Sequence, residues 1–263
     1  MNFNTYFSEL EAKGIKLKDE QKRWYIKKAE TLGEDIKREY PSTPDEAFEV
    51  NTAGLYYAIP VSIARYQHRI RNIPFDRTVK VHTAWDLGFT DSMSIIFFQI
   101  IGREIHIIDF EERTGTSIAE FAKILRNKDF IYGAHLAPHD IKVHELSSGI
   151  SRFDTAAKLG IPFSLVPDVS IADGIDMVRN MFPRLYFHND QPVLELIRHI
   201  ENYSQKWDRT MGQWSGRPDH NTHSHAADAL RYLCIGIDNC TDEVQGVTQE
   251  MADSLWSRHG RRI

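Results

Sequence analysis

Three aspartates occupy positions at which their carboxylates could converge to form a metal site. Asp86 ends the apolar run 81–85, Asp140 comes after the segment 131–135, and Asp228 lies inside the helix-prone segment 224–233. Converging carboxylates are the usual means by which proteins hold catalytic divalent cations. The sequence therefore predicts a metal site in which Asp86 bridges two ions and Asp140 and Asp228 each complete the coordination of one.

The chemistry of such a site is in-line displacement at a phosphate. Two Mg²⁺ or Mn²⁺ ions about 3.5–4 Å apart activate a water molecule and stabilise the leaving oxygen. Without metal, the carboxylates repel one another, and bound cations reverse that repulsion. Phosphodiester hydrolysis is therefore the reaction that the three acids predict.

Each acid also has an ordinary structural explanation. Asp86 can be a turn residue that accepts hydrogen bonds from the Gly88 and Phe89 amides. Asp140 follows Pro138, which cannot continue a central strand, so its carboxylate can cap the next helix. For Asp228 the alternative is a solvated carboxylate in the first turn of its helix.

The geometry of the predicted helix 224–237 makes Asp228 the weakest of the three candidate metal ligands. Its apolar stripe consists of Ala226, Leu230, Leu233 and Ile237, and Asp228 lies roughly opposite. Only a helix contacted on both sides could aim Asp228 at a site.

Other polar residues suggest weaker candidates. His220, His223 and His225 could bind zinc, but no matching Cys or His cluster accompanies them, so structural or DNA-facing roles are favoured. Asp91 could be an auxiliary acid or the far edge of a turn. The basic tail formed by Arg258, Arg261 and Arg262 could touch phosphate, although a frayed terminus is the simpler expectation.

Composition narrows the class of protein. The chain has 263 residues, of which 41% are hydrophobic, so it can bury a substantial core. A net charge of −5 argues against coating of nucleic acid by charge alone, although a local basic groove remains compatible with it. Two cysteines give no disulfide framework, and no run approaches the ~20 apolar residues of a membrane span. We expect a cytoplasmic protein with no membrane partner.

The order of elements predicts an α/β fold. Residues 18–38 form a helix with Tyr25, Ala29, Leu32 and Ile36 on one face, and 43–48 carry a helix-start signature. Strands follow at 78–86, 93–101 and 104–110, the last two joined by the tight turn Gly102-Arg103. Helices at 117–125, 153–159, 171–181 and 193–203 then accompany strands at 131–135 and 162–166, and residues 206–221 form a hairpin or long loop.

A three-strand antiparallel meander followed by helix, strand, helix and strand is the ribonuclease H-like order. In that arrangement the first strand is central and the fourth lies beside it, so Asp86 and Asp140 would be neighbours. We predict a helical extension at 1–75, a ribonuclease H-like mixed sheet flanked by helices at 76–240, and a tail at 241–263.

Four segments resemble the C-terminal half of the large terminase subunit of tailed bacteriophages: residues 38–48, Trp85-Asp86-Leu87-Gly88, Pro138-His139-Asp140, and 223–232. The resemblance covers about residues 20–237. It implies an endonuclease that uses Mg²⁺ or Mn²⁺ to cut concatemeric double-stranded viral DNA in the host cytoplasm, with Asp86, Asp140 and Asp228 as its acids. The implied partners are the terminase ATPase domain, the small terminase subunit and the procapsid portal.

The chain departs from the full-length family in one respect. It contains no G-x-x-x-x-G-K-[ST] phosphate loop, so the ATP motor is absent and we expect no ATPase activity. An isolated nuclease portion, from an engineered fragment or a split gene, fits this pattern and would bind DNA weakly without its motor.

Two further classes of protein remain open. An actin-like or sugar-kinase-like ATPase has Asp-x-Gly-x-Thr after its first strand, close to residues 86–90, but a second such hairpin is missing from the C-terminal half. A docking module for the portal or the small subunit would keep the fold with an idle site.

Overall fold

The computed structural model describes residues 2–32, 36, 40–43, 52–88, 92–142, 151–208 and 210–240. Its contacts divide the chain into two compact units, 1–55 and 56–263. Helix α5 (Ala58–Tyr66) and strand β1 (Ile70–Arg71) belong to the second unit, although they precede residue 76, where the sequence predicted the change from helices to the sheet.

The first unit is built from two amphipathic helices, α1 (Phe3–Ala12) and α2 (Asp19–Leu32). Asn2 caps α1 by accepting hydrogen bonds from the amides of Asn4 and Thr5. Tyr25 and Ile36 pack with Tyr6, Phe7 and Leu10 of α1 in one small core, and Ala29 packs against it. The predicted apolar face that includes Tyr25 therefore packs against α1. The helix start at 43–48 falls outside the described residues from position 44 onward.

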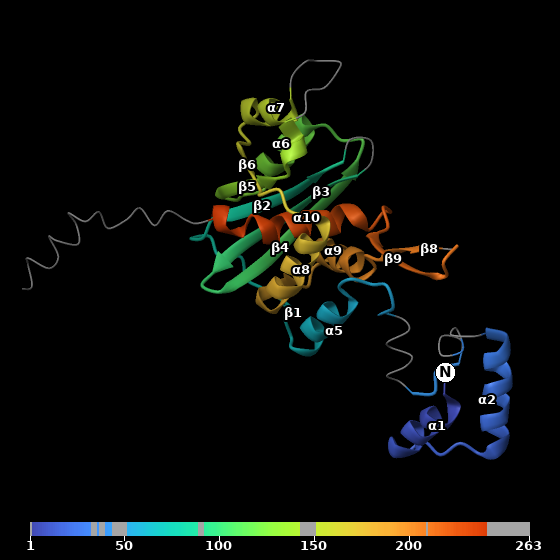
Figure 1. Ribbon diagram of the computed structural model, residues 1–263. Helices are drawn as coiled ribbons and strands as arrows, with labels where there is room; N and C mark the ends of the chain where they lie inside the picture. The colour runs from blue at the N-terminus through green and yellow to red at the C-terminus, as the bar shows by residue number, and fades with distance from the viewer. Residues whose placement is uncertain are drawn as a thin grey trace, which may run out of the picture. The chain divides into compact units, whose positions relative to one another are not determined.

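The second unit is organised around a seven-stranded mixed sheet (Figure 1). Its strand order is β1-β7-β4-β3-β2-β5-β6, with β2 (Val81–Leu87), β3 (Ser92–Ile101) and β4 (Glu104–Thr114) forming the antiparallel meander. Strands β5 (Tyr132–Ala137) and β6 (Phe163–Leu165) add in parallel beside β2. The predicted ribonuclease H-like order is confirmed.

Two apolar cores lie on opposite faces of the sheet because successive residues of a strand point to opposite sides. In β3, Ile96 and Phe98 belong to the core that α5, α8 (Ile171–Met181), α9 (Gln191–Glu201) and α10 (Ser224–Ile235) cover. Ile95 and Phe97 belong to the other core, beneath α6 (Ile118–Asn127) and α7 (Arg152–Lys158). Figure 1 shows α8, α9 and α10 together on one side of the sheet.

Local signals explain several element boundaries. Ser117 and Glu120 form a reciprocal capping box at the start of α6, and Gly102 takes a φ of 62° in the β3–β4 turn. Strand β7 (Leu185–His188) pairs in parallel with β4 and β1, and was not predicted because four residues show too little alternation. The segment after α9 forms a hairpin of β8 (Gln205–Asp208) and β9 (Gln213–Pro218).

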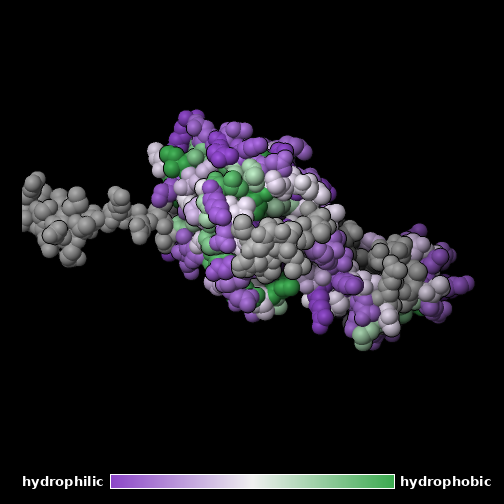
Figure 2. All heavy atoms as spheres, turned by 90° about the horizontal axis from the view of Figure 1, so that it is seen from above, coloured by the Kyte–Doolittle hydropathy of each residue, from purple (hydrophilic) through white to green (hydrophobic). Residues whose placement is uncertain are grey.

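Three short 3₁₀ turns complete the described chain: η2 (His139–Lys142), η3 (Phe182–Arg184) and η4 (Ile237–Cys240). The last helix therefore ends at Ile235, two residues earlier than predicted. In the described ranges, no helix is long and apolar enough to cross a bilayer. The surface seen in Figure 2 is mainly hydrophilic with scattered apolar patches.

Candidate active site

Asp86 lies near the end of β2, on the face of the sheet that α10 covers. Its carboxylate oxygen Oδ2 is 2.9 Å from Nδ1 of His225, and its side chain is 14% exposed. Burial raises the pKa of the Asp86 carboxyl to about 6. The hydrogen bond from His225 opposes this rise, whereas the nearby charge of Asp228 adds to it. The charged form of the largely buried Asp86 carboxyl is thus disfavoured by burial and by the charge of Asp228.

Asp228 is carried by α10, which is enclosed on both sides. The helix contacts β2 and β3 on one side and α8 and α9 on the other (Figure 1). Because α10 is packed on both sides, Asp228 can face a site although it lies opposite the apolar stripe of the helix. Arg231, one turn further along α10, contacts the Asp228 oxygen Oδ1 through Nη2 at 2.8 Å and Nε at 3.3 Å.

Asp140 lies in η2, just after β5. Strand β5 ends at Ala137, as expected from Pro138, which leaves the sheet. Because β5 runs parallel to β2, with Leu136 opposite Ala84, the carboxyl ends of both strands meet at the same edge. Asp140 and Asp86 therefore approach this edge from neighbouring strands, which is the placement that the sequence predicted for them.

Tyr232 of α10 links all three acids electrostatically. Burial raises the pKa of the Tyr232 phenol above its usual value, and the charges of Asp86, Asp228 and Asp140 act in the same direction. All three carboxylates therefore raise the pKa of the Tyr232 phenol, and Asp140 contributes least.

The chemistry of the donors fits a divalent cation, but their present arrangement is not a closed coordination shell. Among the residues that the structure describes, no three His, Cys, Asp or Glu side chains are grouped closely enough to hold a metal ion. Asp86 is hydrogen-bonded to His225 and Asp228 to Arg231. A cation near Asp86 and Asp228 would offset the cost of burying the Asp86 charge and the repulsion between the two carboxylates, and would therefore lower the Asp86 pKa.

A second polar cluster lies two strands away from Asp86 on the same face. Ser94 pairs with Asp86 across β2–β3 and with Glu112 across β3–β4, and its hydroxyl donates to Glu112 at 2.8 Å. His199 of α9 lies 3.2 Å from Glu112 and also 3.2 Å from His223, measured between the two Nδ1 atoms. Asp86, Ser94 and Glu112 therefore form a row across three strands.

The sequence did not identify every residue of this region. Glu112 was missed because its strand was expected to end at Phe110. For His225 the sequence favoured a structural or DNA-facing role over zinc, and its spacing of three residues from Asp228 is the signal that places both near one helix face. Asp91 and the tail arginines Arg258, Arg261 and Arg262 lie outside the described residues, as do Phe89 and Thr90.

Two cavities flank the start of α10. The smaller, about 260 Å³, is lined by hydroxyl, amide and imidazole groups that include His220 and His225. The larger, about 500 Å³, lies between α8, β9 and α10 and includes Asp228 and His220 in its lining. Asp228 thus adjoins the larger cavity, and His225, which contacts Asp86, lines the smaller one.

Similarity to known proteins is found in the structure and not in the sequence. The sequence matches no family model and no curated protein. By structure, a large terminase from a thermophilic bacteriophage is similar at 15% identity and a TM-score of 0.50, over 66% of this chain and 44% of that one. The P22 large terminase nuclease domain is similar at 15% identity and a TM-score of 0.52, over 69% of this chain and 94% of the domain.

The extent of the match differs between these two structures. The chain spans about 44% of the large terminase from the thermophilic phage but nearly the whole P22 nuclease domain. At this level of identity the similarity concerns the fold, and it agrees with the family whose motifs the sequence resembles. The chain has the ribonuclease H-like fold of the large-terminase nuclease domains.

Proposed function

We propose that this protein is a metal-dependent DNA endonuclease that cuts double-stranded DNA during the packaging of a viral genome. The observation that carries the proposal is that Asp86 and Asp140 follow adjacent parallel strands of a ribonuclease H-like sheet, while Asp228 of α10 raises the pKa of Asp86. The similarity in fold to large-terminase nuclease domains supports it. Concatemeric DNA in the host cytoplasm is the proposed substrate.

The three acids would hold Mg²⁺ or Mn²⁺, and a bound pair of ions would supply an activated water and stabilise the leaving oxygen. Within the described part of the chain, His225 contacts Oδ2 of Asp86 and Arg231 contacts Oδ1 of Asp228. Each of these two contacts uses one carboxylate oxygen, and the other oxygen of each acid would bind a cation. His225 and Arg231 would orient the acids, and Asp140 would complete the set from the β5 side.

The proposed partners follow from the same similarity. A terminase ATPase domain, a small terminase subunit and a procapsid portal would bring DNA to the nuclease. The net charge of −5 gives little long-range attraction for DNA, so such partners would raise the local DNA concentration.

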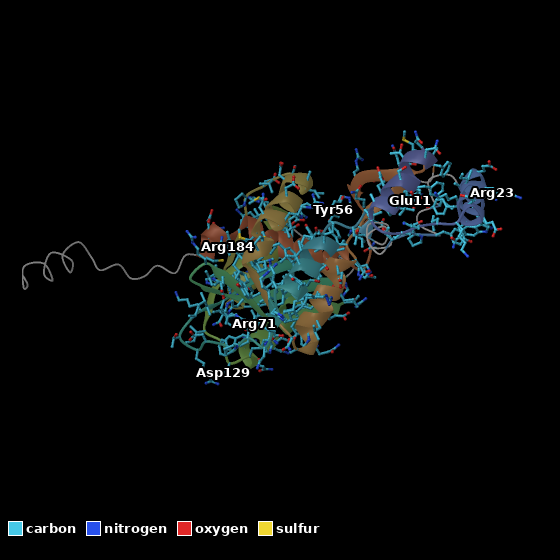
Figure 3. All side chains as sticks on the ribbon, turned by 90° about the horizontal axis from the view of Figure 1, so that it is seen from below. Glu11, Arg23, Tyr56, Arg71, Asp129 and Arg184 are labelled. Atoms are coloured by element: carbon cyan, nitrogen blue, oxygen red, sulfur yellow. The ribbon has the colours of Figure 1, made fainter. Side chains whose placement is uncertain are left out.

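Plasmid cleavage tests the proposal. Supercoiled DNA is incubated with the purified protein in Mg²⁺ or Mn²⁺, with EDTA as the metal-free control. We expect nicking and linearisation that disappear in EDTA and in Asp86→Ala, Asp140→Ala and Asp228→Ala. Asp129→Ala is the matched control because Asp129 projects from the surface with a 90% exposed side chain (Figure 3).

Two results would contradict the proposal. Cleavage that survives in all three acid variants would exclude the assigned residues. If the wild-type protein cut no DNA in either metal while remaining folded, the chain would instead be a docking module with an idle site.

A further inference from the structure

The larger cavity next to Asp228 has one apolar wall and one polar wall. Ile171, Ala172 and Ile175, from the first turns of α8, supply the apolar side, and Ile171 is 50% exposed. The charged residues Arg217, Asp219 and Asp228 stand on the polar side. A cavity of about 500 Å³ with this division is within the size range of small-molecule sites.

The smaller cavity has a different character. The lining residues that the structure describes are all polar: Ser92, Thr114, His220, Asn221, Thr222 and His225. Among these described residues there is no carboxylate, and His225 is hydrogen-bonded to Asp86. The smaller cavity thus offers hydroxyl, amide and imidazole groups for hydrogen bonding beside Asp86, the most buried of the three acids.

His220 lines both cavities, so they are neighbours across the start of α10. A DNA strand also alternates between apolar and polar groups, because each charged phosphodiester is followed by a flat base with an apolar face. We propose that the larger cavity receives one unstacked nucleoside of the strand being cut, while the smaller cavity receives the adjacent backbone. This inference rests on the proposed nuclease function.

The size and lining of the larger cavity favour this occupant. The apolar side chains of α8 can contact the face of a base, and Arg217 at the cavity can neutralise a phosphate next to it. A paired base cannot enter without leaving its stack, at a cost that is smallest for unpaired or mismatched nucleotides. The protein should therefore prefer DNA that is locally unpaired at the cut.

Filling the cavity tests the inference. Ala172 is exposed on α8 and lines the cavity, so Ala172→Phe places a ring in the space without disturbing the core. Asn180→Phe puts the same ring at an exposed position of the same helix that does not line the cavity. Dissociation constants are measured by fluorescence anisotropy in EDTA, with labelled single-stranded DNA and a fully paired duplex.

We expect the wild type to bind single-stranded DNA more tightly than the duplex. Ala172→Phe should raise the dissociation constant for single-stranded DNA by about tenfold or more, which corresponds to ~1.4 kcal/mol. Asn180→Phe should leave it unchanged. Ile171→Ser, which removes apolar wall from a half-exposed position, should weaken binding in the same direction.

DNA binding and DNA cleavage are measured separately, so the nucleoside site and the nuclease function can each be refuted without the other. Equal dissociation constants for wild type, Ala172→Phe and Asn180→Phe would overturn the nucleoside site, even if plasmid cleavage remains normal. Weakened binding by Ala172→Phe in a protein that never cuts DNA would keep the nucleoside site and overturn the nuclease. A duplex that binds as tightly as single-stranded DNA would also overturn the proposed unstacking.

Discussion

Replacing Asp86 with Asn should stabilise the metal-free protein at neutral pH. Burial raises the pKa of this carboxyl from 3.8 to about 6, so the folded state binds its proton more tightly than the unfolded chain does. The folded state is therefore favoured below pH 4 and loses stability as the pH rises to about 6. Because one pKa unit corresponds to about 1.4 kcal/mol, the ionised carboxylate costs about 3 kcal/mol.

Asp86→Asn is neutral at every pH and avoids this cost. In EDTA, we expect the free energy of unfolding of Asp86→Asn to equal that of the wild type near pH 4 and to exceed it by about 3 kcal/mol above pH 7. For a domain of this size that difference shifts the melting temperature by roughly 6–12 °C. Urea unfolding followed by circular dichroism between pH 4 and 8 measures it.

Another buried group titrates in the same range, and the comparison removes its effect. Burial lowers the pKa of His135 to about 4, so the protein loses stability as the pH falls below 6.5. This loss is common to wild type and variant and cancels in their difference. Asp129→Asn is the control for loss of an exposed charge. A difference that does not vary with pH, or an Asp86→Asn protein less stable than the wild type at pH 8, would refute the reasoning.

Three further predictions concern the metal and the packing. Mg²⁺ or Mn²⁺ at 100 times its dissociation constant should stabilise the wild type by about 2.7 kcal/mol in thermal melts but leave Asp86→Ala unchanged, and equal stabilisation would place the ion elsewhere. Burial raises the pKa of Glu112, but hydrogen bonds from His199 and Ser94 outweigh it and lower the pKa overall. Glu112→Gln should therefore cost about 1–3 kcal/mol at pH 7 and nothing once the pH falls well below 4.5, as followed by urea unfolding; a loss that persists in acid would exclude this cause. Gly133→Ala would place its Cβ 2.5 Å from the His82 ring, so we expect a loss of about 1–3 kcal/mol in urea unfolding, and unchanged stability would mean that the ring moves freely.

The sheet could be predicted from sequence because its central strands are long. Strands β2, β3 and β4 have seven, ten and eleven residues, the Gly102 turn joins the last two, and the helices between the later strands imply parallel pairing. Strands β1 and β7 have two and four residues, which is too short for a recognisable period. Their pairing depends on backbone hydrogen bonds to a neighbour that the local sequence does not reveal.

The site was only partly predictable for a similar reason. Asp86 and Asp140 follow from strand order, because each stands at the carboxyl end of an adjacent strand. Glu112 belongs to a strand whose last four residues, Glu111 to Thr114, are charged or polar and look like a loop. The pairs of Asp86 with His225 and Asp228 with Arg231 depend on how α10 packs, and this docking is a tertiary property.

The enclosure of α10 ties the active site to the order in which the chain is made. His225 follows Asp86 by 139 positions, so the hydrogen bond between them closes a loop that spans most of the second unit. On the ribosome, all strands of the sheet are synthesised before Asp228 of α10 is translated. During synthesis the set of three carboxylates can therefore form only after the sheet, and separation of this one helix from the sheet would remove Asp228 from the set.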